Sequence, residues 1–228
     1  LTRMKIDINS IFLSDKIQTN YKMRIVASNQ HIVRADWDNL KIDKNTEQNI
    51  ENSISLLVEL ADGVIISDYN KGVCSSKITQ KIISESNNLR KPVVVDPKGD
   101  NWEKYFGATY ITPNTKEASM IVDYPLNSDA DFHRAGLEIS DKYNIDHCLI
   151  TRGADGMSMV SKEETFHVKS KAQEVYDVSG AGDTVVACLS VAILEGKSKK
   201  ECVKFANKAA GVVVSHLGTS AITLDELS

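Results

Sequence analysis

The stretch DVSGAGDT, residues 177–184, places two glycines and an alanine directly before an aspartate, and the apolar run VVACLSVAIL follows at once. The apolar run predicts a buried helix that begins at the glycines and runs to about Glu195, with Gly196 as its C-cap. The first N–H groups of a helix have no acceptor within it and lie at the positive end of its dipole, so they can bind an anion. Glycine permits close approach because it has no Cβ. We therefore expect an anion-binding helix start with the carboxylate of Asp183 beside it.

Two better-known glycine-rich motifs do not fit this stretch. A dinucleotide fingerprint would need Gly or Ala where Val185 stands, and a Walker phosphate loop would need a G-K-[ST] ending. Asp183 itself has two interpretations. It is either a capping acid favoured by the helix dipole, or a base that takes a proton from an attacking hydroxyl beside the anion site. The residues alone leave both open.

Composition sets the broad class of the protein. The chain has 228 residues, a net charge of -4, 42% hydrophobic and 25% charged residues, which suits one sizeable α/β domain or two small ones. No basic block indicates a nucleic-acid partner. The apolar runs are too short to span a membrane, and the N-terminus LTRMKIDINS lacks the apolar region of a signal peptide, so we expect a cytoplasmic protein without membrane contact.

The four cysteines also favour a reducing compartment. They are widely spaced, lie mostly in apolar surroundings and form no C-x-x-C pair: Cys74, Cys148, Cys188 and Cys202. We expect reduced thiols rather than a zinc site or a disulfide framework.

The pattern along the chain predicts an α/β fold. Residues 20–36 read as a β hairpin with a polar break at 28–30, and residues 46–62 read as a helix. Short apolar runs then alternate with helical patterns, which is typical of parallel strands joined by crossover helices. These runs are GVIISD (63–68), PVVVD (92–96), TYITPN (109–114) and CLITRG (148–153). A second strong helix is expected over residues 199–218, ending at Gly218.

Polar residues follow the predicted strands. Because ligands bind beyond the carboxyl ends of parallel strands, we expect Asp68, Asp96, Asn114 and residues 151–153 to lie along one edge of the sheet. Strand ends are also polar simply because they leave the core, so the pattern alone does not establish a site.

Four motifs in order resemble a known family. DVSGAGDT resembles the C-terminal signature of the ribokinase-like (PfkB) carbohydrate kinases, and three further blocks match it: TPNTKEA (112–118), TRGADGM (151–157) and FANKAAGVVVSHLGT (205–219). Other blocks look more narrowly like the D-glycero-β-D-manno-heptose-7-phosphate kinases: MRIVASNQHIVRAD (23–36), ISDYNKG (66–72), VVDPKG (94–99) and AQEVYDVSGAGDT (172–184). The resemblance implies a three-layer α/β/α domain over residues 1–228 with a mostly parallel central sheet and a small β lid.

The resemblance starts near residue 20 and has one large departure. The family's first strand with its acidic sugar contact, and the G-G-x-x-x-N segment after it, do not appear in this sequence. We therefore expect a kinase domain that lacks its N-terminal part. Some of these kinases are fused to a C-terminal adenylyltransferase, and from the ending GTSAITLDELS we do not expect that second activity in this sequence. Two alternatives stay open: another ribokinase-like kinase acting on a ketohexose phosphate, ribose or a vitamin-like alcohol, or an inactive fragment whose exposed sheet edge serves binding or oligomerisation.

The resemblance also implies catalytic roles. Asp183 would be the catalytic base and Gly180, Ala181 and Gly182 the anion hole, with the γ-phosphoryl group of ATP passing to the sugar to give heptose 1,7-bisphosphate. Asn114 and Glu117 would organise Mg²⁺ through water. The alternative for this last pair is a helix cap, with Asn114 and Glu117 as the partners of a capping box.

Further residues are implied for nucleotide, sugar and partner. Those expected to contact ATP are Thr115, Lys116, Thr151, Gly153, Gly156, Asn207 and Gly211. As alternatives, residues 153–156 could simply form a hairpin turn, and Asn207 and Gly211 could form a close contact between helices. Those expected to hold the sugar phosphate are Asp68, Lys71, Arg24, Arg34 and Lys98, because cationic groups suit a terminal phosphate, although single surface cations are usually only solvated. Family members often dimerise through the lid, so a homodimer is expected.

Overall fold

The computed structural model describes residues 2–4, 6–27, 30–38, 41–170, 176–216, 218, 220–223 and 225–227. Part of the expected hairpin break, residues 28 and 29, lies outside this set, as do residues 172–175 of one matching block and residues 217 and 219 of another. Within the described residues, no helix is both long and apolar enough to cross a membrane.

A six-stranded sheet forms the centre of the molecule, with its strands in chain order. They are β3 Val64–Ser67, β4 Val93–Asp96, β5 Tyr110–Ile111, β6 His147–Thr151, β7 Met157–Val160 and β8 Thr165–Val168. The first four are parallel, and β6, β7 and β8 are joined in antiparallel pairs. The carboxyl ends of the four parallel strands therefore meet at one edge, as the sequence predicted.

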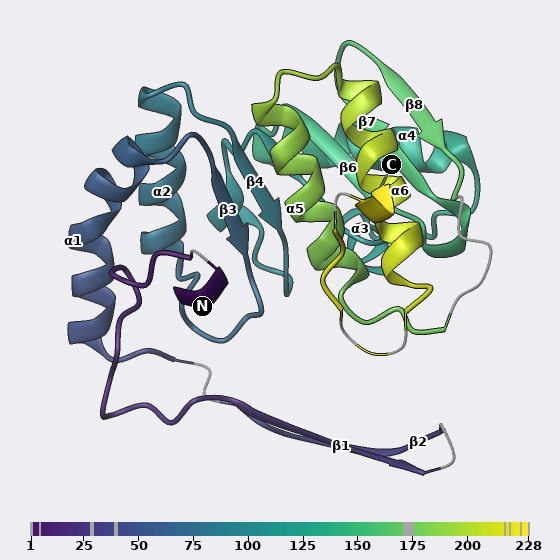
Figure 1. Cartoon of the computed structure of the whole chain (residues 1–228). Coiled ribbons are helices and arrows are strands. Elements are labelled where there is room, and N and C mark those ends of the chain that lie inside the picture. The colour runs from purple at the N-terminus through teal and green to yellow at the C-terminus, as the bar shows by residue number, and fades with distance from the viewer. Residues whose placement is uncertain are drawn as a thin grey trace.

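Helices cover both faces of the sheet, which gives three layers (Figure 1). One face packs against α2 Ser76–Asn88, α3 Thr115–Val122 and α4 Asp129–Tyr143, and the other against α5 Ala181–Leu194 and α6 Lys199–Val213. Helix α1 Lys44–Leu60 packs on α2 at the side of the molecule. Strand β4 is buried on both sides because Val93 and Val95 belong to one core and Val94 to the other. This continuous burial explains the unbroken apolar runs of the sequence.

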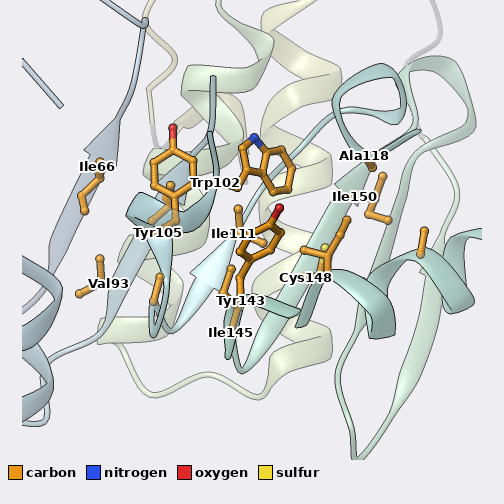
Figure 2. Packing of buried hydrophobic residues seen from close by; sticks show 14 of the residues in the cluster. Ile66, Val93, Trp102, Tyr105, Ile111, Ala118, Tyr143, Ile145, Cys148 and Ile150 are labelled. Atoms are coloured by element: carbon orange, nitrogen blue, oxygen red, sulfur yellow. The ribbon is translucent and has the colours of Figure 1, made fainter. Parts of the chain in front are cut away.

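Aromatic residues form part of the hydrophobic core between the sheet and helices α2, α3 and α4 (Figure 2). Trp102 and Tyr105 are 1% and 0% exposed, and the ring centroids of Trp102 and Tyr143 are 6.0 Å apart. Tyr105 belongs to a short 3-10 helix, Glu103–Tyr105. Its hydroxyl donates to Asp68 Oδ2 at 2.7 Å, beyond the end of β3. The core is thereby tied directly to the edge where the strands end.

The N-terminal hairpin forms a separate two-stranded antiparallel sheet that extends away from the body (Figure 1). Its strands are β1 Tyr21–Ala27 and β2 Gln30–Trp37, which confirms the expected hairpin. Their register gives it two unlike faces. One, the apolar hairpin face, carries Tyr21, Met23, Ile25, Val33, Ala35 and Trp37, and the other, the charged hairpin face, carries Lys22, Arg24, Arg34 and Asp36.

Some boundaries differ from the sequence expectation. Strand β5 contains only Tyr110–Ile111 of the six-residue run, because Pro113 has no N–H to extend the ladder. Helix α6 ends at Val213 rather than at Gly218. The cysteines are free thiols, with Cys148 and Cys202 buried and the other two partly exposed.

Candidate active site

The start of α5 carries the glycine motif that predicted an anion site. Gly180 precedes the helix with φ of 83°, a left-handed conformation that glycine adopts without steric cost. The first bond along the helix runs from the Thr184 N–H to the Gly180 carbonyl at 2.9 Å. The N–H groups of Gly182 and Asp183 therefore have no acceptor within the helix. A Cβ at Gly182 would meet no atom within 4 Å, so this turn faces open space.

Ala181, one of the four site residues expected in this motif, does not have a free N–H group. The N–H of Ala181 donates to the Val178 carbonyl at 3.3 Å, which engages it within the preceding turn. In the first turn of the helix, the N–H groups that could receive an anion in this conformation are thus those of Gly182 and Asp183.

Two hollows meet at this helix start. An acidic pocket of about 220 Å³ lies on the side of β3 and β4, and an apolar pocket of about 230 Å³ lies toward α6. Three residues line both: Thr151, Gly182 and Val185. Asp183 lines the acidic pocket at this junction. A phosphoryl donor in one hollow and an acceptor in the other would meet beside its carboxylate.

Four carboxylates surround the acidic pocket: Asp68, Asp96, Glu117 and Asp183. Asp68 and Asp96 come from the edge predicted from strand ends, Glu117 comes from the first turn of α3, and Asp183 comes from α5. Burial, followed by the negative charges of Glu117 and Asp183, raises the pKa of Asp96 from its ordinary value of 3.8 to about 7. The concentration of negative charge is therefore costly unless a cation shares the pocket.

Asn114 and Glu117 form a capping box at the start of α3. Asn114 Oδ1 accepts from the Glu117 N–H at 2.9 Å, and Glu117 Oε2 accepts from the Asn114 N–H at 3.0 Å. The other oxygen of Glu117 pairs with Lys98 Nζ at 2.7 Å. The helix-cap interpretation is thus present in the structure, and the same two side chains also line the acidic pocket. The two roles are compatible.

The donor set suits a hydrated Mg²⁺ ion. Carboxylate and amide oxygens are the ligands this ion prefers, and it keeps several of its waters. Among the described residues, no three acidic, histidine or cysteine side chains are close enough to hold a metal directly. Contact through water, with phosphate oxygens completing the coordination, is therefore the arrangement that these residues fit.

Asp68 is the most firmly held residue of the pocket. It is 4% exposed, and its Oδ2 accepts from Tyr105 and from the buried ammonium of Lys104. Its Oδ1 accepts from the Asn70 N–H at 2.6 Å. One charged partner and two further donors satisfy this buried carboxylate. Asp68 therefore fixes the loop after β3, and its remaining contact with the pocket is small.

The apolar pocket contains the residues expected near the nucleotide. Gly153, Gly156, Asn207 and Gly211 all line it. Asn207 is 4% exposed and donates from Nδ2 to the Lys169 carbonyl at 2.9 Å. A Cβ at Gly156 would lie 1.9 Å from the Val168 carbonyl oxygen, so this turn between β6 and β7 requires glycine. The hairpin-turn interpretation is confirmed, and the turn also forms a pocket wall.

Other expected site residues lie apart from both hollows. Thr115 and Lys116 line a separate depression at the start of α3. The Thr115 hydroxyl also donates to the carbonyl of Thr151, which lines both hollows, at 3.2 Å. Lys71 forms an ion pair with Asp38 at the base of the hairpin. Arg24 and Arg34 lie on the charged hairpin face and line neither hollow, whereas Lys98 lines the acidic pocket.

Sequence reasoning missed Tyr69. Its hydroxyl donates to Asp183 Oδ1 at 2.8 Å, across 114 positions of sequence. It lies directly after Asp68 within the block ISDYNKG, but a half-exposed tyrosine after a strand carries no local signal of such a contact.

The sequence profile of the pfkB family of carbohydrate kinases matches residues 1–226. The chain belongs to this family. Two curated relatives, both named bifunctional protein HldE, illustrate the similarity. The protein of a Nitratiruptor species is 42% identical over 221 residues, which covers 96% of this chain and 47% of the relative. That of Helicobacter pylori (strain J99) is 39% identical over 225 residues, covering 98% and 48%. The pfkB chain thus spans about half the length of these relatives.

Solved structures of the family share the fold. Phosphofructokinase-2 from Escherichia coli in complex with potassium matches with a TM-score of 0.73 at 20% identity, covering 86% of this chain and 64% of that one. Ribokinase of Arabidopsis thaliana complexed with ribose and ATP gives 0.64 at 21% identity, covering 82% and 61%. This pfkB-family chain therefore shares the three-layer fold of these structures, with a mostly parallel central sheet.

The charge of the acidic pocket predicts a pH-dependent stability. Folded Asp96 holds its proton up to a pKa of about 7, whereas the unfolded chain releases it near 3.8. The folded state binds more protons between these values, so this residue's contribution to stability falls as pH rises from about 4 to about 7 and stays low above it. Asp96→Asn should raise the thermal unfolding midpoint at about pH 8, and the gain should shrink toward about pH 5.

Thermal unfolding followed by circular dichroism across this pH range checks the expectation. Asp62→Asn, at an exposed acid in the turn before β3, is the matched control and should change the midpoint equally at every pH. An Asp96→Asn gain that does not depend on pH would contradict the account.

Proposed function

We propose that this pfkB domain is a Mg²⁺- and ATP-dependent kinase that phosphorylates D-glycero-β-D-manno-heptose 7-phosphate to the 1,7-bisphosphate, a precursor of ADP-heptose and the lipopolysaccharide core. The observation that carries the proposal is the position of Asp183, where an acidic pocket and an apolar pocket meet at unpaired helix N–H groups. A cytoplasmic location suits both ATP and a sugar phosphate. The names of the curated relatives and the narrow resemblance of the sequence blocks support the heptose as acceptor.

In this mechanism the sugar lies in the acidic pocket with its anomeric hydroxyl at Asp183. The hydroxyl oxygen attacks the γ-phosphorus of ATP, and its proton passes to the Asp183 carboxylate. The bond between the γ-phosphorus and the bridging oxygen breaks, and ADP leaves with that oxygen. The N–H groups of Gly182 and Asp183 stabilise the negative charge on the phosphoryl oxygens during transfer.

The remaining pocket residues position the two substrates. Gly153, Gly156, Asn207 and Gly211 form the apolar wall against which the adenosine part of ATP would pack. Asn114 and Glu117 would hold Mg²⁺ through water, where the ion would neutralise phosphate charge. Such a reaction depends on positioning and charge neutralisation, which is what this pair of hollows can supply.

The charged hairpin face is the part of the chain that suits the terminal phosphate of the sugar. Arg24 and Arg34 are direct cross-strand neighbours, so a phosphate bound there would meet two guanidinium groups. Arg34 also pairs with Asp36 on the same face at 2.9 Å, whereas like charges opposite one another cost stability. On the same face, Lys22 Nζ lies 5.8 Å from the ring centre of Tyr69, whose hydroxyl bonds to Asp183. The face is thereby connected to the acidic pocket.

Changing the base tests the chemistry. Asp183→Asn keeps the size of the side chain but cannot take a proton, so turnover should fall by roughly 10²- to 10⁴-fold while ATP binding is retained. A coupled assay of ADP release with heptose 7-phosphate measures turnover, and calorimetry with ATP measures nucleotide binding. Glu195→Gln, at the other end of α5, is the matched control and should leave both unchanged.

Three results of this assay would contradict the proposal. Unchanged turnover in Asp183→Asn would remove Asp183 as the base. If the unaltered protein released ADP faster with fructose 6-phosphate or ribose than with heptose 7-phosphate, the acceptor would be that other sugar. No release with any sugar would favour a binding module instead.

The arginine pair predicts a substrate-specific effect. Arg24→Gln and Arg34→Gln should each raise KM for heptose 7-phosphate about tenfold, because each removes a charged hydrogen bond to the phosphate. KM for ATP, and activity with the heptose that lacks the phosphate, should change little. Equal losses with both sugars would mean that the arginines do not contact the phosphate.

The apolar hairpin face suits a second copy of the chain. Its members Tyr21 and Trp37 are 55% and 54% exposed, with ring centroids 5.5 Å apart, and Ile25 is 46% exposed. An exposed apolar face of this kind is stabilised when a partner covers it. We expect a homodimer in which two such faces pack together.

Sedimentation velocity tests the dimer. Ile25→Lys should convert it to a monomer at micromolar concentration, because the ammonium would be buried between the two faces. Leu56→Lys, at another exposed apolar residue on α1, should leave the dimer intact. A wild-type chain that sediments as a monomer would exclude this interface.

A further inference from the structure

We propose that Tyr69 is a positioning residue for the catalytic base. Its hydroxyl donates to Asp183 Oδ1 at 2.8 Å and lies in the lining of the acidic pocket. A carboxylate has two oxygens, so a fixed donor on Oδ1 leaves Oδ2 to accept the proton of the sugar hydroxyl. The inference rests on the proposed function, because it assigns Tyr69 a part in the same proton transfer.

The hydroxyl remains a donor throughout the working range of pH. Burial, followed by the neighbouring carboxylate of Asp183, raises the pKa of Tyr69 to about 12. Although 53% of the residue is exposed, its hydroxyl lies against the acidic pocket. Tyr69 therefore orients the carboxylate and does not itself exchange a proton.

The backbone on both sides of Tyr69 is held in place. Asp68 is fixed by Lys104 and Tyr105 from the core, and it also accepts from the Asn70 N–H at 2.6 Å. Asn70 has φ of 55°, a left-handed conformation that sets the turn immediately after the tyrosine. An anchored loop gives a hydroxyl a defined direction, whereas a free tyrosine would sample several rotamers.

One residue of the charged hairpin face, Lys22, lies near the same ring. Lys22 Nζ is 5.8 Å from the ring centre, within reach of a cation–π contact. Tyr69 thus lies between the hairpin and Asp183, so that a change in the hairpin that displaces the ring also disturbs the base.

The test is a double-mutant cycle of Tyr69→Phe and Asp183→Asn in phosphoryl transfer. Phenylalanine keeps the ring and removes only the hydroxyl. Tyr69→Phe should lower kcat roughly tenfold in the wild-type background, as expected for loss of one hydrogen bond to a charged group, with KM for ATP unchanged. In the Asp183→Asn background it should not change the residual rate, because its effect passes through the carboxylate.

A control variant separates this role from a general effect on the fold. Tyr110→Phe removes a hydroxyl from a tyrosine at the start of β5, which pairs in the sheet with the start of β6, and should leave kcat unchanged. An equal loss from Tyr69→Phe in both backgrounds, or no loss in the wild type, would overturn the inference.

The cycle is informative even if the proposed acceptor is wrong. If the protein phosphorylates a different sugar, the proposed function fails and the same cycle is measured with that sugar. If it phosphorylates none, the cycle is measured by urea unfolding. Non-additive midpoint shifts would then support the bond between Tyr69 and Asp183, and additive shifts would overturn the inference.

Discussion

The left-handed backbone at Gly180 directs the first turn of α5 into the space between two hollows. In that conformation the N–H groups of Gly182 and Asp183 have no acceptor within the helix, and the Asp183 carboxylate lies beside them. Any residue with a Cβ would adopt this φ only at a cost, and a side chain at Gly182 would occupy the space where the hollows join. The site therefore depends on the backbone conformation at Gly180 and on the space left free at Gly182.

The edge of the sheet supplies the other half of the site, and its charge explains much of its construction. Four carboxylates share one pocket, and lysines neutralise two of them locally: Lys104 pairs with Asp68, and Lys98 pairs with Glu117. Asp96 has no such ion pair among the described contacts, and the pKa of its carboxyl is raised accordingly. An arrangement of this kind is poised for a hydrated cation, because its positive charge relieves an electrostatic cost that folding leaves in place.

Much of the fold could be predicted from residue patterns, and the exceptions have physical causes. Continuous apolar runs indicated parallel strands because both faces of the sheet are covered, as Val94 illustrates. Strands β7 and β8 gave no comparable signal, since residues 157–168 mix apolar side chains with serine, lysine and glutamate. The site was predictable where motifs are local, as at Asp183, and unpredictable where a contact joins distant segments, as at Tyr69. Thr115 and Lys116 lie between Asn114 and Glu117 in the same motif but line a different depression, because neighbouring residues on a helix point in different directions.

The most direct test of the central claim is a crystal structure of this protein with Mg²⁺, a non-hydrolysable ATP analogue and heptose 7-phosphate. The account predicts the adenosine in the apolar pocket, the terminal phosphate at the N–H groups of Gly182 and Asp183, and the anomeric hydroxyl within hydrogen-bond distance of the Asp183 carboxylate. A nucleotide bound away from the start of α5, or a sugar whose anomeric hydroxyl is remote from Asp183, would contradict it.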